Sequence, residues 1–584
     1  MVKINSLMKI SAFAIVMAAL SACAAIGGGS SAQSEQSLSP KAQLYADYVS
    51  ARYASNLNDA ASRSDYFSKA FARRPNDLDL GQKALASAIN NGEDAMARTL
   101  SIAVLGLDET DGSARAVMGA NALAKGNYEE SITYLANANA GIGVEIFNAM
   151  MRGWAQIGLG DTDAAIITFQ SMEGGRYFEF LGNLQIAIIT MQKGEAETAA
   201  NMFVVLDEVN LAPVESVLAQ VRGFMERGEK DKALEKLNIY AKANGGALSG
   251  PIRYYIDAIE ADRNLQWRLT PAQSASRALS EPAFRFFGAQ QQYEPAETFL
   301  RLALELDPKN DKARLFLGSV LEAVERNDDA LAQYRLIDQS SPYAVSARLS
   351  EADILFGDDK NDAGIKVLEA VQASHPSRVT QSSLGRAYLI LEDYEQALPY
   401  YEALIEDMSE EELRENTQVN YLRGICLERL GRWEEAVADF EFVLKHNPDN
   451  ADALNYLGYT WVDKGVNLTE AFVMIEKAVE LEPTSGAIID SLGWAHYKLG
   501  RYTQARINLE EAAERSPTSA TIIDHLGDVY WKLGRKKEAG YQWERAATLD
   551  PTEPELKVIK AKLKDGLEAK KELEAKKELG AEAE

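Results

Sequence analysis

The side chains that could carry out chemistry in this chain are few and scattered. Two cysteines, Cys23 and Cys426, and four histidines stand among 584 residues, which excludes a disulfide framework and a cysteine metal cluster. His496 and His525 are well separated in the sequence, with no carboxylates at ligand spacing beside them. No nucleophile, base and orienting residue stand in a recognisable pattern. The sequence therefore predicts no enzyme, no metal and no cofactor.

Cys23 is the reactive residue whose surroundings form a pattern. Lys3 and Lys9 precede a short apolar run from Ile10 to Leu20, which is the layout of a secretory leader. A transmembrane helix needs about 20 apolar residues, so a membrane span is the weaker interpretation. Leu20-Ser21-Ala22-Cys23 resembles the bacterial lipoprotein box. The alternative is an ordinary leader with a cysteine near the cut by chance.

The lipoprotein resemblance implies a lipid anchor and a location. Residues 1–22 would be removed, and Cys23 would carry diacylglycerol and an N-acyl chain such as palmitate. Ala24 stands where such lipoproteins often carry the aspartate that retains them in the inner membrane, so the resemblance favours the periplasmic face of the outer membrane. Residues 23–40 are rich in Gly, Ser and Gln and are expected to form a flexible tether.

Composition and charge restrict the class of protein. The chain is 46% hydrophobic and 25% charged, which excludes fibrous, polytopic membrane and wholly disordered proteins. Its 87 acidic and 61 basic residues give a net charge of −26, so nucleic acid is not expected as a partner.

A repeat with a period of about 34 residues organises most of the sequence. Glycines recur at this interval in the N-terminal half, at Gly92, Gly126, Gly160, Gly194 and Gly228. Two C-terminal segments show the period most clearly, SLGWAHYKLGRYTQARINLEEAAERSP from Ser491 and HLGDVYWKLGRKKEAGYQWERAATLDP from His525. We therefore predict one helix pair per repeat, in which the glycine ends the first helix and a proline ends the second. An unrelated helical bundle is the less favoured alternative for the N-terminal half.

The second of these segments resembles the tetratricopeptide (TPR) repeat. Leu526, Gly527, Tyr530, Ala539, Trp543, Ala546 and Pro551 match the family pattern, in which only the first tryptophan is missing. The resemblance implies an all-α fold, a right-handed TPR superhelical solenoid of about 13–14 helix pairs with a C-terminal capping helix. We expect small residues to let the helices of a pair approach while large residues fill the space beside them.

The spacing of the repeats predicts the domain organisation. After the leader (1–22) and the lipidated tether (23–40) come an N-terminal degenerate array (41–246) and an inserted helical segment (247–276) with a subdomain boundary near residue 247. A C-terminal array (277–551) and a capping helix with a charged tail (552–584) complete the chain.

The first helices of TPR units line a concave groove, and the family's groove positions predict the partner-binding residues. In the last four repeats these positions hold aromatic and polar side chains suited to a protein segment: Tyr421, Asn455, Tyr459, Asp490, Trp494, Tyr497, Asp524 and Trp531. The alternative is that the rings pack against adjacent helices or the capping helix.

Taken together, the chain is similar to bacterial outer-membrane TPR lipoproteins that act as adaptors of periplasmic carboxyl-terminal processing proteases. The resemblance implies a membrane-anchored scaffold that recruits or activates a protein partner, with no catalysis of its own. The alternatives are an assembly scaffold of a secretion, pilus or polysaccharide-export complex and, least favoured, an enzyme with a site in residues 247–276.

Overall fold

The computed structural model describes residues 39–136, 142–172, 175–209, 213–243, 250–263, 265, 267–290 and 292–567. The predicted leader, the lipidation residue Cys23 and the charged tail from residue 568 lie outside these ranges, as does the tether up to residue 38. Helices connected by turns and loops make up the described ranges, in which no strand occurs.

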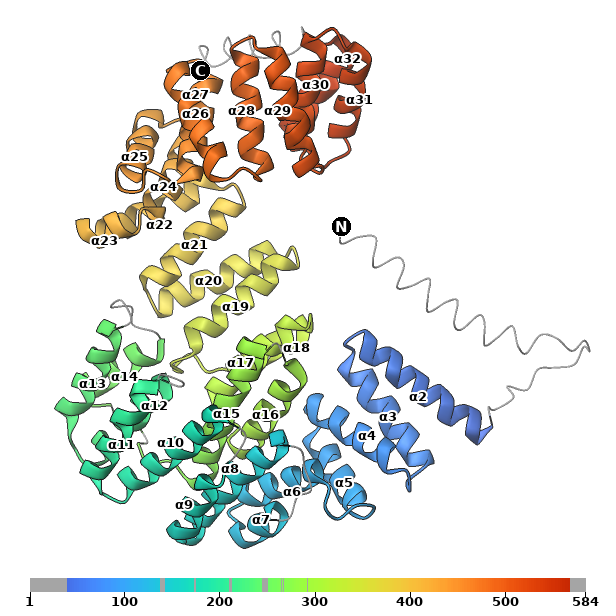
Figure 1. The fold of residues 1–584 in the computed structure, drawn as a ribbon, viewed down its shortest axis with the longest axis vertical. Helices are drawn as coiled ribbons and strands as arrows, with labels where there is room; N and C mark the ends of the chain where they lie inside the picture. Colours follow the sequence, from blue (N-terminus) through green and yellow to red (C-terminus); the bar gives the residue numbers. More distant parts are fainter. Residues whose placement is uncertain are drawn as a thin grey trace, which may run out of the picture. The chain divides into compact units, whose positions relative to one another are not determined.

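The chain divides into two compact units, Met1–Ala347 and Arg348–Glu584 (Figure 1). The helices of the first unit are α2 (Pro40–Asn56), α3 (Ala60–Arg73), α4 (Leu78–Asn90), α5 (Asp94–Leu105), α6 (Gly112–Ala124), α7 (Tyr128–Leu135), α8 (Ile142–Leu159), α9 (Thr162–Gln170), α10 (Arg176–Gln192), α11 (Ala196–Val209), α12 (Pro213–Glu226), α13 (Lys230–Ala243), α14 (Gly250–Glu260), α15 (Pro271–Gln290), α16 (Tyr293–Leu306), α17 (Asp311–Ala323) and α18 (Asn327–Arg335). The boundary between the units falls within α19 (Ala344–Gly357).

The remaining described helices belong to the second unit. They are α20 (Asn361–Ser374), α21 (Arg378–Ile390), α22 (Tyr394–Asp407), α23 (Glu410–Glu415), α24 (Gln418–Arg429), α25 (Trp433–His446), α26 (Ala451–Lys464), α27 (Leu468–Leu481), α28 (Gly486–Lys498), α29 (Tyr502–Arg515), α30 (Ala520–Lys532), α31 (Lys536–Ala546) and α32 (Glu553–Asp565). Apart from α14, α23 and α32, the described helices form successive pairs, and the predicted all-α solenoid of stacked helix pairs is confirmed.

Left-handed glycines end the first helix of most pairs. Gly92, Gly126, Gly160, Gly194 and Gly228 have φ between 72° and 84°, a backbone conformation that costs glycine little because it has no Cβ. The next amide then bonds back across the turn, as Glu93 N–H does to Ala88 O at 2.9 Å. The glycine period in the sequence is therefore the period of these turns.

Close packing within a pair depends on a second set of glycines. A Cβ added at Gly493 in α28 would lie 2.6 Å from Cγ of Leu509 in α29, and one at Gly527 in α30 would lie 2.5 Å from the indole of Trp543 in α31. Leu509 and Trp543 are buried. The predicted pairing of small and large residues is thus what the helices use to approach each other.

Within the stretch expected as an insert, α14 continues the repeat pattern of the first unit. α14 packs against α12 and α13 through Ile252 and Ile256, and its turn ends at Asp262, whose φ is 49°. Asp262 lies one repeat period after Gly228, so α14 is the first helix of another repeat. The second helix of that repeat is missing, because residues 263, 265 and 267–270 are not helical.

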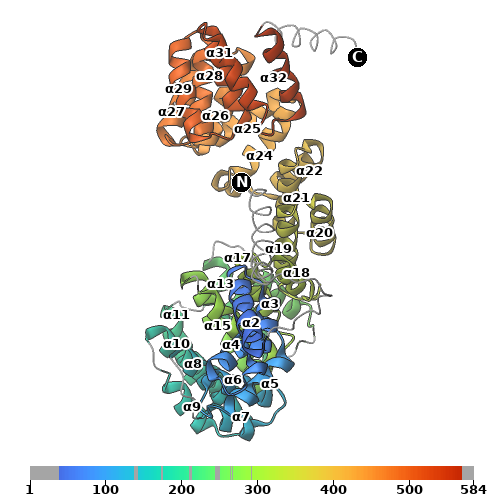
Figure 2. The same cartoon turned by 90° about the vertical axis from the view of Figure 1, so that its right-hand side faces the viewer.

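The chain folds back after α14, and the two compact units separate at Ala347 rather than near residue 247. α15 contacts α8 and α6, and α16 contacts α6 and α4 (Figures 1 and 2). Tyr177 of α10 donates a hydrogen bond to the Glu281 carbonyl at 3.0 Å, and Arg98 of α5 pairs with Glu305 at 2.9 Å. These contacts hold residues up to Ala347 in one unit.

Candidate functional site

The first helices of the last four repeats carry the predicted partner-binding residues. Tyr421 lies on α24, Asn455 and Tyr459 on α26, Asp490, Trp494 and Tyr497 on α28, and Asp524 and Trp531 on α30. α26 contacts α28, and α28 contacts α30, so the residues are spread over a row of neighbouring helices within the second unit. Their exposure differs, and this decides which of them a partner is able to reach.

Trp494 lies in the core between two repeats. Its side chain is 3% exposed, and its ring stacks on His525 with 4.0 Å between ring centroids and on Tyr497 with 4.6 Å. This three-ring stack joins α28 to α30. Trp494 therefore packs against adjacent helices, which was the alternative to a role in the groove. Tyr497 at the end of the stack is partly exposed.

Asp490 is also buried and serves the same stack. Its two carboxylate oxygens lie 3.0 and 3.1 Å from Nδ1 of His525. Burial alone would lower the pKa of His525, but the Asp490 carboxylate outweighs burial and raises it. His525 therefore holds its proton more strongly than a free histidine does, and Asp490 orients the ring against Trp494.

The capping helix α32 contacts Asp524, the predicted groove residue at the start of the last repeat. Lys562 is 1% exposed, and its ammonium lies 2.5 Å from Asp524 Oδ2 and 2.8 Å from Asp528 Oδ1. Asp528 also accepts a hydrogen bond from Trp543 Nε1 at 3.0 Å. Asp524 therefore binds the protein's own helix rather than an open groove.

Trp531 packs at the turn between α30 and α31. Its ring lies 5.4 Å from that of Trp543, and the Lys536 ammonium stands 4.6 Å above it. Trp531 is partly exposed. Its ring contacts lie within its own helix pair, so we do not group it with the side chains of α26 and α28.

Six of the eight predicted residues are partly exposed, and four of them lie along α24, α26 and α28: Tyr421, Asn455, Tyr459 and Tyr497. The side-chain oxygen of Asn455 is buried and has no hydrogen-bond partner within the described ranges. Tyr459 lies one helical turn further along α26, and burial is the main cause that raises its pKa. We call Asn455 and Tyr459 the α26 patch, in which a partly exposed amide side chain and a partly exposed aromatic ring lie side by side.

The charges around the α26 patch are mainly acidic. Asp490, Asp463 and Glu428 outnumber Arg429 among the charged side chains that act on Tyr459, and Asp463 pairs with Lys498 at 3.2 Å. Glu428 accepts a hydrogen bond from Tyr456 at 3.2 Å. A partner segment with basic side chains would complement this surface.

The second unit also has a surface groove that was not predicted from the sequence. Trp433, Trp461 and Met474 line an open groove of about 980 Å³ beside α25 and α27, and Val473 is 59% exposed there. The repeat that begins at Ala451 is 35 residues long, one more than the period, because α28 begins at Gly486. The extra residue gives a turn with two left-handed positions, Gly465 at φ 71° and Asn467 at φ 45°.

Groups suited to catalysis are sparse in the described residues. No group of three or more His, Cys, Asp or Glu side chains there is placed to hold a metal ion. Cys426 is buried, and burial raises the pKa of its thiol to about 12, so the thiolate nucleophile is scarce at neutral pH. Of the helices described, none has the length and apolar character to cross a bilayer.

Comparison with known proteins identifies the repeat. The family model described as tetratricopeptide repeat matches residues 382–441, 421–483 and 491–554, all within the second unit. A TPR repeat-containing protein of Pseudomonas aeruginosa is 29% identical over 191 residues, which are 33% of this chain and 32% of that protein. The cellulose synthase operon protein C of Escherichia coli is 22% identical over 285 residues, 46% of this chain and 24% of that protein. The chain thus matches about a third or less of the length of these relatives.

Solved structures of repeat proteins resemble parts of the chain. A tetratricopeptide repeat protein from Parabacteroides merdae aligns with a TM-score of 0.34 at 18% identity, over 50% of this chain and 97% of its own. A TPR protein with an unusual peptide-binding site aligns with a TM-score of 0.28 at 21% identity, over 32% of this chain and 95% of its own.

Proposed function

We propose that this tetratricopeptide-repeat chain is a membrane-tethered scaffold that binds a protein partner through the first helices of its second unit. It works without catalysis, by holding the partner near the membrane and raising its local concentration there. The observation that carries the proposal is the α26 patch, in which the partly exposed side chains of Asn455 and Tyr459 lie one helical turn apart on α26.

We place the binding surface on the second unit because the first helices of the first unit are covered by other helices of the same unit. In the first unit, α15 and α16 lie against the first helices α4, α6 and α8. In the second unit, the Lys562 contact covers the last repeat, while Tyr421, Asn455 and Tyr459 remain partly exposed on earlier repeats. The acidic surroundings of the patch favour a partner segment with basic side chains.

Single substitutions test this surface. Asn455→Ala and Tyr459→Ala are expected to weaken capture of the partner by about tenfold or more each, as for central interface residues, with the melting temperature nearly unchanged. Tyr541→Ala is the matched control, because Tyr541 lies on α31 and is 66% exposed. Equal capture by all three variants and the parent chain would contradict the proposal.

We extend the proposal to the anchor and the compartment. The sequence around Cys23 supports a lipidated N-terminus at the periplasmic face of the outer membrane. Cys23→Ser is expected to move the chain from the membrane fraction to the soluble fraction with its helical content intact, because stable anchoring needs the acyl chains. Retention of the Ser variant in the membrane fraction would refute a cysteine anchor.

The partner we favour is a periplasmic carboxyl-terminal processing protease, which the chain would recruit or activate. This rests on the resemblance of the lipoprotein box and the C-terminal repeats to such adaptors. The alternative, an assembly scaffold of a secretion, pilus or polysaccharide-export complex, gains support from the partial similarity to the cellulose synthase operon protein C. Purification of the lipidated chain with its bound proteins separates the two, since a protease supports the first and export components support the second.

A further inference from the structure

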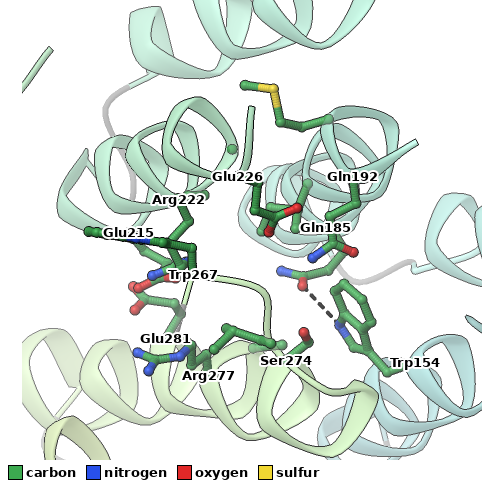
Figure 3. Close-up of a pocket in the computed structure, with 16 residues that line it drawn as sticks. Trp154, Gln185, Gln192, Glu215, Arg222, Glu226, Trp267, Ser274, Arg277 and Glu281 are labelled. Atoms are coloured by element: carbon green, nitrogen blue, oxygen red, sulfur yellow. Dashed lines mark hydrogen bonds and ion pairs between the residues drawn. The ribbon is translucent and has the colours of Figure 1, made fainter. Parts of the chain in front are cut away.

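A cavity in the first unit is too small to bind a ligand. It lies between α8, α10, α12 and α15 and measures about 30 Å³, which is room for about two water molecules. Figure 3 shows Trp154 and Gln185 on one side of this space and Glu215 and Arg222 on the other, and Arg222 pairs with Glu215 at 2.6 Å. The groove beside α25 and α27 in the second unit, at about 980 Å³, is at the upper end of the range of ligand sites, about 300–1,000 Å³.

The groove of the second unit exposes apolar side chains from α25, α26, α27 and the turn before α27. Val473 of α27 is 59% exposed, and Val466 of that turn is 42% exposed. Two tryptophans beside them are partly exposed, and aromatic side chains are prominent among the residues that anchor a partner. We call this surface the α27 groove, and its apolar residues are Trp433, Val437, Trp461, Val466, Val473 and Met474.

The α27 groove and the α26 patch lie on different sides of α26. Trp461 and Tyr459 are two positions apart on this helix, and successive residues of a helix are rotated by about 100°. The two side chains therefore point about 160° apart. The α27 groove is thus a second surface, which is formed mainly by the second helices α25 and α27 rather than by first helices.

Three exposed carboxylates border the α27 groove. They are Glu434 and Glu441 of α25 and Glu470 of α27. No ion pair within the described ranges involves any of the three. One cation of the protein, the Lys464 ammonium, lies 4.9 Å from the centroid of the Trp433 ring, so this ring accepts an ammonium. The groove therefore combines an apolar floor with a surplus of negative charge, which a basic partner complements.

The spacing of the carboxylates selects a segment of protein rather than a small cation. Glu434 and Glu441 are seven residues apart on α25, which is two helical turns and about 10 Å. A helix that lies along α25 presents two basic side chains at this spacing when they are also seven residues apart, with apolar residues between them on the same face. Anionic lipid head groups and nucleic acid would be repelled by the three carboxylates.

We propose that the α27 groove binds an amphipathic helix of a partner protein. The apolar face of this helix covers the two tryptophans of the groove, and its Lys or Arg side chains pair with the three glutamates. Because the α26 patch lies on the other side of α26, the second unit is able to hold two protein segments at once.

Fluorescence anisotropy of a labelled peptide, titrated with the full chain, tests the proposal. The peptide repeats the unit Lys-Ala-Gln-Leu-Leu-Ala-Gln twice and ends in Lys, which places lysines seven residues apart with leucines on the same face. The expected result is saturable binding with a dissociation constant near or below about 100 μM. The same peptide with Glu in place of Lys is expected to bind at least about tenfold more weakly. Absence of saturable binding, or equal affinity for the two peptides, would overturn the proposal.

A substitution in the groove locates the peptide on the chain. Val473→Lys is expected to weaken binding by about tenfold or more, because the new ammonium repels the lysines of the peptide. Ile507→Lys is the matched control, because Ile507 lies 34 residues further on, at the equivalent position of the next helix pair, and is 54% exposed. With folding established by circular dichroism, unchanged affinity in Val473→Lys or an equal loss in Ile507→Lys would overturn the proposal. A dimer of the parent chain in light scattering that Val473→Lys dissociates would assign the groove to a second copy, and would also overturn it.

A charge-matched pair of double variants tests the carboxylates. Glu441→Gln combined with Glu470→Gln is expected to weaken peptide binding by about threefold to tenfold, as for the loss of two exposed ion pairs. Glu476→Gln combined with Glu480→Gln changes the net charge equally, on exposed residues of α27 that do not line the groove. Equal losses in the two double variants would mean that the peptide responds to net charge alone, which contradicts a site in the groove.

Discussion

Lys562→Met is the substitution with the most direct structural consequence in the second unit. It replaces a 1% exposed ammonium by an uncharged side chain of similar length. Burial alone would lower the pKa of this ammonium, but Asp528 and Asp524 outweigh burial and raise it. Met would leave both carboxylates facing the capping helix without their cation, although Trp543 would still donate to Asp528.

The expected cost is about 3–5 kcal/mol, the range observed when one partner of a buried ion pair is removed. Because stability in a repeat array is a sum over neighbouring elements, the loss should concentrate at α30–α32. Burial raises the pKa of Asp524, so the Asp524 carboxylate should take up a proton readily. We therefore expect the cost to shrink as the pH falls toward about 4, where ordinary aspartates protonate.

Urea denaturation followed by tryptophan fluorescence is the assay, since Trp531 and Trp543 lie in the affected repeat. Lys560→Met on the same helix is the control, because Lys560 is exposed and should cost less than about 0.5 kcal/mol. A loss in Lys562→Met no larger than in this control, or a loss that does not diminish in acid, would refute the role given to the ion triad.

Three further predictions concern the same unit. Gly493→Leu should cost about 2–4 kcal/mol in a denaturant titration, because its Cβ would overlap Leu509; a cost within about 0.5 kcal/mol would contradict the packing role. The raised pKa of His525 stabilises the fold below its unfolded value of about 6.5, and this contribution is lost as the pH rises through the folded pKa. Asp490→Asn should flatten that pH dependence of the unfolding free energy, and an unchanged profile would argue against the pair. Trp494→Ala should cost about 3–5 kcal/mol, and a variant as stable as the parent would mean that its ring is not core.

The sequence was sufficient to predict the repeat because the repeat is local. A left-handed turn needs glycine, as at Gly92 and Gly126, and close helix contact needs a small residue, as at Gly527. These requirements recur with the period and involve residues close together in the chain. Helix pairs and their boundaries could therefore be predicted over most of the described chain.

The features that could not be predicted depend on contacts that the repeat period does not determine. The family's groove positions select one face of a helix but do not tell how deeply a residue is buried. Buried Trp494 and partly exposed Tyr459 both occupy such positions, so the sequence does not distinguish their burial. The contact of Lys562 with Asp524 and the contact of α15 with α8 join residues that are distant in the chain, and the repeat period carries no signal for them. For the same reason the sequence gives no signal for the division between the compact units at Ala347.

Site-specific photocrosslinking at Tyr459 tests the central claim most directly. A photoreactive phenylalanine analogue would replace Tyr459 on α26 in the full lipidated chain, and Tyr541 on α31 in a parallel sample. The account predicts that a protein partner is captured from position 459 and not from position 541. Capture from position 541 alone, or from neither position while the partner still co-purifies with the chain, would contradict binding by the first helices of the second unit.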